Sequence, residues 1–287
     1  MIYLILSILA STAIFVVFKL FERFKINTLQ AIVINYITAC CCGLLSYEGT
    51  INISETSNSK WFLGAILLGF LFISVFNLMA LTAQRHGLSV ASVAGKMSVM
   101  IPVVFGIHVY AESISVQKIF GIVLALIAVY LTAIKAKSSI NIRQSLWLPF
   151  LLFLGSGVID TSIKYLETTY VPENGIPIFS ATIFGCAAII GILILIIMKL
   201  KNTFVFNVKN IFGGIILGII NYYSIFFLLR ALQFEGLESS MLFTVNNVAI
   251  VMVSTLVGLF LFKESISKKN WFGISLAIIS ILLVTLA

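Results

Sequence analysis

The stretch Glu264-Ser-Ile-Ser-Lys-Lys-Asn-Trp-Phe-Gly-Ile-Ser-Leu-Ala277 repeats an earlier part of the chain. The earlier copy, Glu112-Ser-Ile-Ser-Val-Gln-Lys-Ile-Phe-Gly-Ile-Val-Leu-Ala125, begins 152 residues before it (264 − 112). Between Glu112–Ala133 and Glu264–Thr285, 11 of 22 positions are identical. Shared hydrophobicity does not explain the matched glutamate or the matched glycine nine residues beyond it. The chain therefore contains an internal repeat.

The same relationship extends along both halves of the chain. The segment Gln84-Arg-His-Gly87-Leu matches Gln233-Phe-Glu-Gly236-Leu at a spacing of 149 residues. Closer to the start of each half, three residues align at a spacing of 145: Ser11, Lys19 and Glu22 with Ser156, Lys164 and Glu167. Because residues 136–145 are polar and basic, we interpret residues 1–135 and 146–287 as two repeats joined by a cytoplasmic linker.

The composition predicts the environment of the fold. Hydrophobic residues make up 61% of the 287 residues and charged residues only 10%, whereas a soluble domain carries about 25% charged residues. The apolar residues run in blocks that approach the ~20 residues of a membrane-spanning helix. Segments of about ten alternating residues, which are typical of transmembrane barrels, are absent. The sequence therefore predicts an all-α polytopic membrane protein.

The apolar blocks indicate ten transmembrane helices. We expect them at Ile2–Leu20, Leu29–Ser46, Lys60–Ala83, Leu88–Tyr110, Gln117–Ile134, Trp147–Leu166, Ile178–Leu200, Ile211–Gln233, Ser239–Phe262 and Trp271–Leu286. Each half then holds five helices, and because five is odd the second half enters the membrane in the opposite orientation. Inverted repeats of this kind are characteristic of secondary transporters.

The basic residues predict the topology. Thirteen fall in loops expected on one side: Lys19, Arg23, Lys25, Arg85, Lys135, Lys137, Arg143, Lys199, Lys201, Lys209, Lys263, Lys268 and Lys269. The opposite side has two, Lys60 and Lys118. By the positive-inside rule we expect both termini outside a cell (inner) membrane. Nucleic-acid binding is not needed to explain the net charge of +8.

Metal, cofactor and enzyme signals are weak. Cys40, Cys41 and Cys42 are consecutive on one predicted helix, so their side chains diverge and do not converge on one metal ion, and Cys186 stands alone in another helix. The sequence has no Walker lysine motif, nucleophile elbow or His-Glu-x-x-His pair. We expect no metal, no cofactor and no enzymatic activity.

Two five-helix repeats, each ending in a glutamate loop, a glycine and an apolar helix, resemble the drug/metabolite transporter superfamily and most closely its ten-helix EamA family. The family often has a proline about ten residues before each glutamate. Pro102 matches it in the first half, whereas the second half has Ser254, which bears on whether the ninth helix bends as the fourth does. The resemblance implies a cavity lined mainly by helices 1, 3, 4, 6, 8 and 9 and export of small polar metabolites such as amino acids.

Lys96 is the strongest candidate site residue. An ionisable side chain inside a membrane span is costly and marks functional sites. Lys96 lies eight residues into the expected fourth helix, about 12 Å from its inner end. Its neighbours one turn away are apolar residues and a serine, so the ammonium needs an acid from another helix, a ligand carboxylate or water. Snorkelling of the side chain to the membrane interface is the alternative.

Asp160 has two candidate partners. Lys164 lies four residues further along the same helix, which favours a local ion pair. Alternatively, Asp160 pairs with Lys96 across a cavity and exchanges with substrate or protons. A proton is accordingly the candidate coupling ion.

Uncharged polar residues occur at similar depth. Asn246 and Asn247 lie where the repeat predicts the equivalent of Lys96. Asn221 and Tyr222 fall in the middle of the eighth span and Asn77 falls in the third. Buried amides need hydrogen-bond partners, which either a polar solute or a neighbouring helix supplies.

The sequence thus predicts a secondary transporter that exports small polar or zwitterionic metabolites, amino acids or related compounds, by alternating access. A flippase for lipid-linked or amphiphilic solutes is one alternative, and a non-transporting membrane enzyme or assembly protein is another. The expected partners are the solute, the lipid bilayer and a second copy of the chain in a homodimer.

Overall fold

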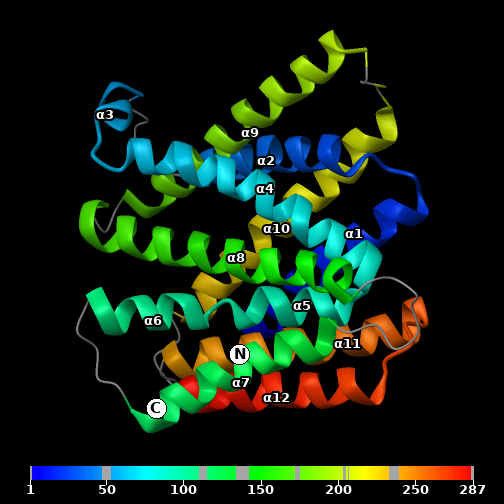
Figure 1. Ribbon diagram of the computed structural model, residues 1–287. Coiled ribbons are helices and arrows are strands. Elements are labelled where there is room, and N and C mark those ends of the chain that lie inside the picture. Colours follow the sequence, from blue (N-terminus) through cyan, green and yellow to red (C-terminus); the bar gives the residue numbers. More distant parts are fainter. Residues whose placement is uncertain are drawn as a thin grey trace. The chain divides into compact units, whose positions relative to one another are not determined.

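The computed structural model describes residues 2–46, 53–109, 115–133, 142–171, 175–202, 205, 207–232 and 239–285. Every regular element in these ranges is a helix (Figure 1). The helices are α1 (Ile2–Arg23), α2 (Thr28–Leu45), α3 (Ile53–Ser57), α4 (Phe62–His86), α5 (Leu88–Met97), α6 (Met100–Val109), α7 (Val116–Ala133), α8 (Ile142–Tyr170), α9 (Ile176–Leu200), α10 (Val208–Leu232), α11 (Ser239–Phe262) and α12 (Lys268–Thr285).

Eight helical segments among the described residues are long and apolar enough to cross a membrane: α1, α2, α4, α5 with the start of α6, α8, α9, α10 and α11. Helix α7 is apolar but shorter. Backbone N–H and C=O groups in a bilayer have to be satisfied within the protein, which a helix achieves along its own length. The prediction of an all-helical, multi-pass membrane protein is confirmed. The short helix α3, in a segment expected to be a polar link, was not predicted.

The chain divides into two compact units that do not coincide with the two halves of the sequence. The first unit comprises Met1–Leu20, Leu78–Val158 and Tyr223–Ala287, and the second comprises Phe21–Asn77 and Ile159–Tyr222. Each unit therefore combines segments from both halves, and the division passes through α1, α4, α8 and α10.

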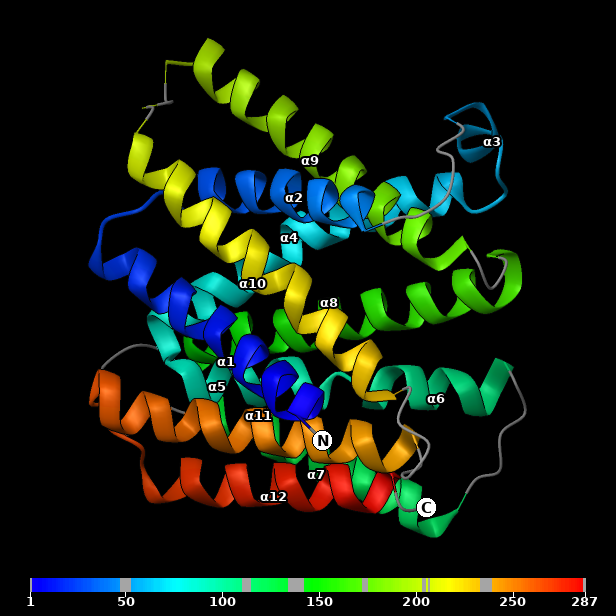
Figure 2. The ribbon, with the colours of Figure 1, turned by 180° about the vertical axis from the view of Figure 1, so that it is seen from behind.

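In the first unit, α7 and α12 lie side by side and run antiparallel (Figures 1 and 2). These are the helices that carry the repeated sequence. A Cβ atom at Gly121 of α7 would lie 2.3 Å from Val284 of α12, and a Cβ at Gly273 of α12 would lie 2.9 Å from Thr132 of α7. The two matched glycines therefore permit close helix packing, each against the other half of the chain.

The serine that ends each Glu-Ser-Ile-Ser segment caps the helix that follows. The Lys118 N–H donates to Ser115 Oγ at the start of α7 (3.1 Å), and the Asn270 N–H donates to Ser267 Oγ at the start of α12 (3.1 Å). A serine at this position satisfies a backbone donor that has no partner within the helix. The side-chain Nδ2 of Asn270 also donates to the carbonyl of Thr132 at 2.7 Å, which links the beginning of α12 to the end of α7.

In the second unit, α2 packs antiparallel against α9. Gly191 of α9 lies against Val33 of α2, and Gly43 of α2 lies against Ala181 of α9. Tyr36 of α2 is fully buried, and its hydroxyl donates to the carbonyl of Phe72 at 2.8 Å.

Candidate functional site

The expected fourth span is interrupted in its middle. Helix α5 ends at Met97 and α6 begins at Met100, so Ser98 and Val99 separate the two (Figure 1). Pro102 explains the interruption, because it has no N–H to donate to the carbonyl of Ser98 and its ring crowds that carbonyl. The Ser98 carbonyl instead accepts from the Ile101 N–H at 2.9 Å, which closes a tighter turn. Ser98 Oγ donates to the Gly95 carbonyl at 2.6 Å.

The corresponding helix of the second half is continuous. Helix α11 runs through Ser254, which takes the place of the proline (Figure 2). Ser254 Oγ donates to Ser92 Oγ of α5 at 2.6 Å and lies 3.1 Å from the carbonyl of Val251. The serine therefore keeps α11 helical and joins it to α5.

Contacts along α5 and α11 define the register of this pair. The helices are antiparallel, because Ser89 lies beside Gly258 while Ser92 contacts Ser254. Val99 lies seven residues beyond Ser92, and Asn247 lies seven residues before Ser254. Seven helical residues span about 10 Å in each direction. Asn246 and Asn247 are therefore level with the interruption between α5 and α6.

Three predicted site residues belong to the first unit and lie near the level of the interruption between α5 and α6. Lys96 is part-buried in the last turn of α5, and Asn247 is part-buried on α11. Asn246 is only 2% exposed, and its Oδ1 accepts no hydrogen bond from any residue that the structure describes. A buried amide oxygen without a donor is costly, so this position favours an additional polar partner.

The other four predicted site residues belong to the second unit. Asp160 of α8 is exposed, Asn221 of α10 is buried and Tyr222 is part-buried. Asn77 of α4 donates through Nδ2 to the carbonyl of Ile73, one turn earlier, at 2.8 Å. That bond satisfies one amide group within the helix. The pairing of Asp160 with Lys96 or Lys164 stays a prediction.

Asn35 of α2 is a polar residue that the sequence reasoning missed. It is fully buried, and neither of its amide atoms has a hydrogen-bond partner among the described residues. Gly218 of α10 lies directly against its backbone, with 2.7 Å between the Asn35 carbonyl and the position of a Cβ at Gly218. An asparagine inside an apolar run was the available signal.

Glu264 is not among the predicted site residues, but its carboxylate reaches a helix that is distant in the sequence. Lys263, directly after α11, has a φ of 51°, which prevents the helix from continuing. The Glu264 N–H then donates to the Gly258 carbonyl at 3.0 Å. The Leu88 N–H at the start of α5 then donates to the carboxylate, with 2.9 and 3.1 Å to its two oxygens. An anion at a helix N-terminus is stabilised by unpaired N–H groups and by the helix dipole.

The surroundings of the Glu264 carboxyl shift its pKa in opposite directions. Burial raises the pKa of Glu264 above that of an ordinary glutamate, although the Leu88 N–H, the Lys19 ammonium and the Ser89 N–H each lower it. Lys19 is held close by a hydrogen bond from its Nζ to the Gln84 carbonyl at 2.6 Å. Desolvation outweighs these favourable contacts, so the carboxyl binds a proton at a higher pH than it would in water.

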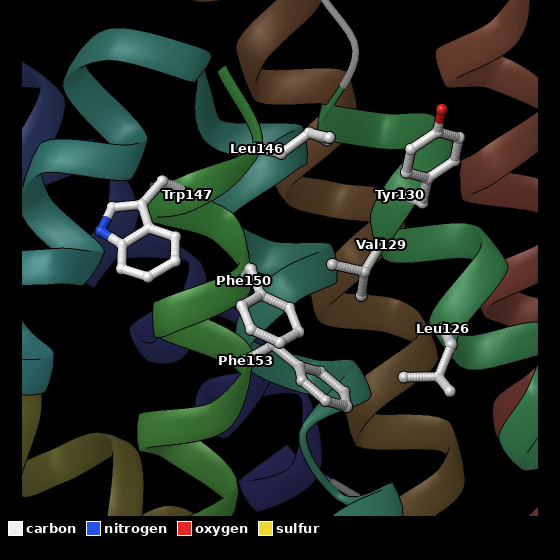
Figure 3. Close-up of a pocket in the computed structure, with 7 residues that line it drawn as sticks. All are labelled: Leu126, Val129, Tyr130, Leu146, Trp147, Phe150 and Phe153. Carbon is white, nitrogen blue, oxygen red and sulfur yellow. The ribbon is translucent and has the colours of Figure 1, made fainter. Parts of the chain in front are cut away.

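An apolar groove between α7 and α8 does not suit a polar solute. It has a volume of about 380 Å³ and is lined by Leu126, Val129, Tyr130, Leu146, Trp147, Phe150 and Phe153 (Figure 3). Tyr130 and Trp147 contribute its only side-chain polar atoms among these lining residues. Its composition matches a surface in contact with hydrocarbon.

Comparison with known proteins identifies a relative. No family model matches the chain. A crystal structure of a protein with 15% sequence identity covers 98% of this chain and 97% of that one with a TM-score of 0.56, which indicates a shared fold. An uncharacterized protein of Haemophilus influenzae is 31% identical over an alignment of 281 positions, which covers 94% of this chain and 93% of the relative. The chain belongs to the same family as this Haemophilus influenzae protein.

Proposed function

We propose that the chain is a secondary transporter of the EamA type that exports small polar metabolites, amino acids or related compounds, by alternating access. In this proposal the chain has ten membrane spans in two inverted five-helix repeats. Both termini lie outside the inner membrane, as the distribution of basic residues predicts.

The pairing of equivalent helices supports the inverted repeats. Helix α2 packs on α9, α5 on α11 and α7 on α12, and each pair is antiparallel and takes one helix from each half. Between α7 and α12, Gly121 meets Val284 and Gly273 meets Thr132. Those four positions form two pairs related by the repeat spacing of 152 residues (273 − 121 and 284 − 132). Two halves inserted in opposite directions would produce such reciprocal contacts.

The interrupted helix is the observation on which the proposal depends most. Transporters of this class bind solutes where a spanning helix is broken near the membrane midplane, because the break releases backbone groups from helical hydrogen bonding. Here the break lies level with the buried Oδ1 atom of Asn246, which lacks a described donor. A solute amino or hydroxyl group would satisfy that oxygen.

Lys96 adds a positive charge to this site. It lies in the last turn of α5, two residues before the break. An ammonium to carboxylate hydrogen bond is shorter and stronger than a neutral one. A solute with both an amino group and a carboxylate matches Asn246 and Lys96 together, which favours zwitterionic substrates.

The location of the break also fits alternating access. At the spacing of 149 residues, Asn247 is the repeat equivalent of Ser98 (98 + 149), and at the spacing of 152 residues that relates Pro102 to Ser254, Ala249 is the equivalent of Met97 (97 + 152). The α5–α11 register independently places Asn247 level with Val99. Equivalent positions of the two repeats therefore lie at one level, where a rocking motion would expose a site to either side in turn.

Reconstituted protein tests the proposal directly. Liposomes that contain the purified chain are challenged with labelled amino acids, related polar metabolites and one labelled amphiphile. We expect saturable uptake of at least one zwitterionic solute and none in empty liposomes. Absence of flux for every solute would contradict transport, and movement of the amphiphile alone would favour the flippase.

A further inference from the structure

The Glu264 carboxylate lies against two glycines, Gly87 and Gly258, at positions where a residue with a side chain would clash with it. A Cβ atom at Gly87 would lie 2.6 Å from its Oε2, and a Cβ at Gly258 would lie 2.5 Å from the same oxygen. Gly87 has φ of 100°, a conformation that favours glycine. Gly87, immediately before α5, and Gly258 of α11 thus allow this carboxylate to reach the first N–H groups of α5.

Helix α5 connects this carboxylate to the candidate solute site. It has ten residues, from Leu88 at the carboxylate to Met97 beside the break, and Lys96 lies in its last turn. Ten helical residues span about 15 Å. Because α5 and α6 are separate helices, a rigid-body displacement of α5 at Leu88 would also displace Lys96.

Protonation would weaken the contact between Glu264 and α5. An ionised carboxylate accepts hydrogen bonds through both oxygens, whereas a protonated one has a hydroxyl that donates. The attraction of the negative charge to the N-terminus of α5 disappears as well. The Ser89 hydroxyl lies beside the carboxyl, is only 4% exposed, and has no partner among the described residues.

Most charged residues on the segments next to this carboxyl are cationic, and Glu22, three residues beyond Lys19 on α1, is the acidic exception. Lys19 approaches from α1, and the end of α4 carries Arg85 and His86 immediately before Gly87. The segment of Glu264 itself carries exposed lysines at 263, 268 and 269. Lys19 is the one that favours ionisation of Glu264 directly. Burial has the opposite effect and raises the pKa of the Glu264 carboxyl. The change between its protonated and ionised forms therefore occurs at a higher pH than for an exposed glutamate.

We infer that Glu264 is the positioning residue that couples proton binding to solute transport, by releasing α5 when its carboxyl is protonated and holding α5 when it is ionised. The proton comes from water at this end of the first unit and returns to water when the carboxyl ionises again, with no other bond made or broken. This inference rests on the proposed transport function.

Glu264→Gln tests the coupling, because glutamine keeps an acceptor oxygen for the Leu88 N–H but does not titrate. In liposomes with an imposed pH gradient, we expect the wild-type chain to accumulate a labelled zwitterionic amino acid. Glu264→Gln should lose at least tenfold of this accumulation but retain exchange of labelled for unlabelled solute. Glu55→Gln, on exposed α3, should behave as wild type.

The outcomes separate the two proposals. No wild-type flux would contradict transport itself, whereas wild-type flux with undiminished gradient-driven accumulation by Glu264→Gln would overturn the coupling role. Lys19→Met supplies an independent readout if the glutamine variant does not fold. Since Lys19 lowers the pKa of Glu264, its removal should shift the pH profile of uptake to higher pH. An unshifted profile would also overturn the inference.

Discussion

Helices α5–α6 and α11 come from equivalent places in the two repeats, yet one is broken and the other continuous. The difference follows from one position, Pro102 in the first half and Ser254 in the second. Proline leaves the carbonyl of Ser98 without its helical partner, whereas Ser254 keeps the helix and donates to Ser92 on the broken one. Related sequences thus form an interrupted helix in one half and a continuous helix in the other.

The comparison indicates where a solute and a moving part would be found. The broken side contributes Lys96, which lies in the last turn of α5 before the break. The continuous side contributes Asn246, whose oxygen lacks a described donor, at the same level. A transporter with this asymmetry would move α5 while α11 stays in place.

Introducing a proline into α11, as in the interrupted helix, should have the largest effect on stability. Ser254→Pro would remove a helical hydrogen bond in the middle of α11, beside the fully buried Ile250 and Val251. The expected loss of stability is about 3 kcal/mol or more. Thermal unfolding in detergent measures it as a lower midpoint than that of the wild-type protein.

The reverse change, Pro102→Ser, restores a donor for the Ser98 carbonyl and should join α5 to α6. We expect unchanged or higher thermal stability and slower transport. A variant with this stability and wild-type transport rates would show that the break is not needed for function.

Lys96→Met should impair transport more than it affects folding. Methionine keeps length and apolarity, so the fold should be retained. A hydrogen bond to a charged group contributes about 1.5–3 kcal/mol, which corresponds to roughly a tenfold to hundredfold loss in the uptake of a carboxylate-bearing solute. Lys60→Met, at an exposed position before α4, is the matched control. Wild-type uptake by a folded Lys96→Met protein would favour snorkelling instead.

Disturbing the contact between Glu264 and the start of α5 should have a smaller effect on stability. Gly87→Ala places a Cβ against the carboxylate and forces alanine into a backbone conformation that is nearly restricted to glycine. The expected loss of stability is of order 1–3 kcal/mol. Gly95→Ala, inside α5 with nothing within 4 Å of the added Cβ, should gain roughly 0.5–1 kcal/mol. Equal thermal midpoints for the two variants would contradict the contact of Gly87 with the Glu264 carboxylate.

Helix positions were predictable because long apolar runs have few other stable structures in a membrane. Each expected span overlaps a helix of the structure, and the ends differ by a few residues, as where α1 continues to Arg23. The exact break at Ser98–Val99 was not predictable. Pro102 indicates a bend, but the choice of carbonyl that accepts the Ile101 N–H depends on packing around the turn.

The site was less predictable than the fold. Polar residues in apolar runs predict Lys96 and Asn246 as site residues, because burial of such groups is costly wherever they occur. The Glu264 contact joins residues 176 apart and depends on glycines at positions 87 and 258, which are far apart in the sequence, so no local pattern reveals it. The repeated Glu-Ser-Ile-Ser segment marked Glu264 as unusual without indicating its partner.

Access of water-soluble reagents to Asn247 tests the central claim most directly. In a variant with Cys40, Cys41, Cys42 and Cys186 replaced by serine, Asn247→Cys is exposed to a membrane-impermeant thiol reagent from either side of the liposome. We predict labelling from both sides, reduced by a transported amino acid, as with a solute site that opens alternately. If the exposed control Asn58→Cys reacts but Asn247→Cys reacts from neither side, the break between α5 and α6 does not line a solute pathway.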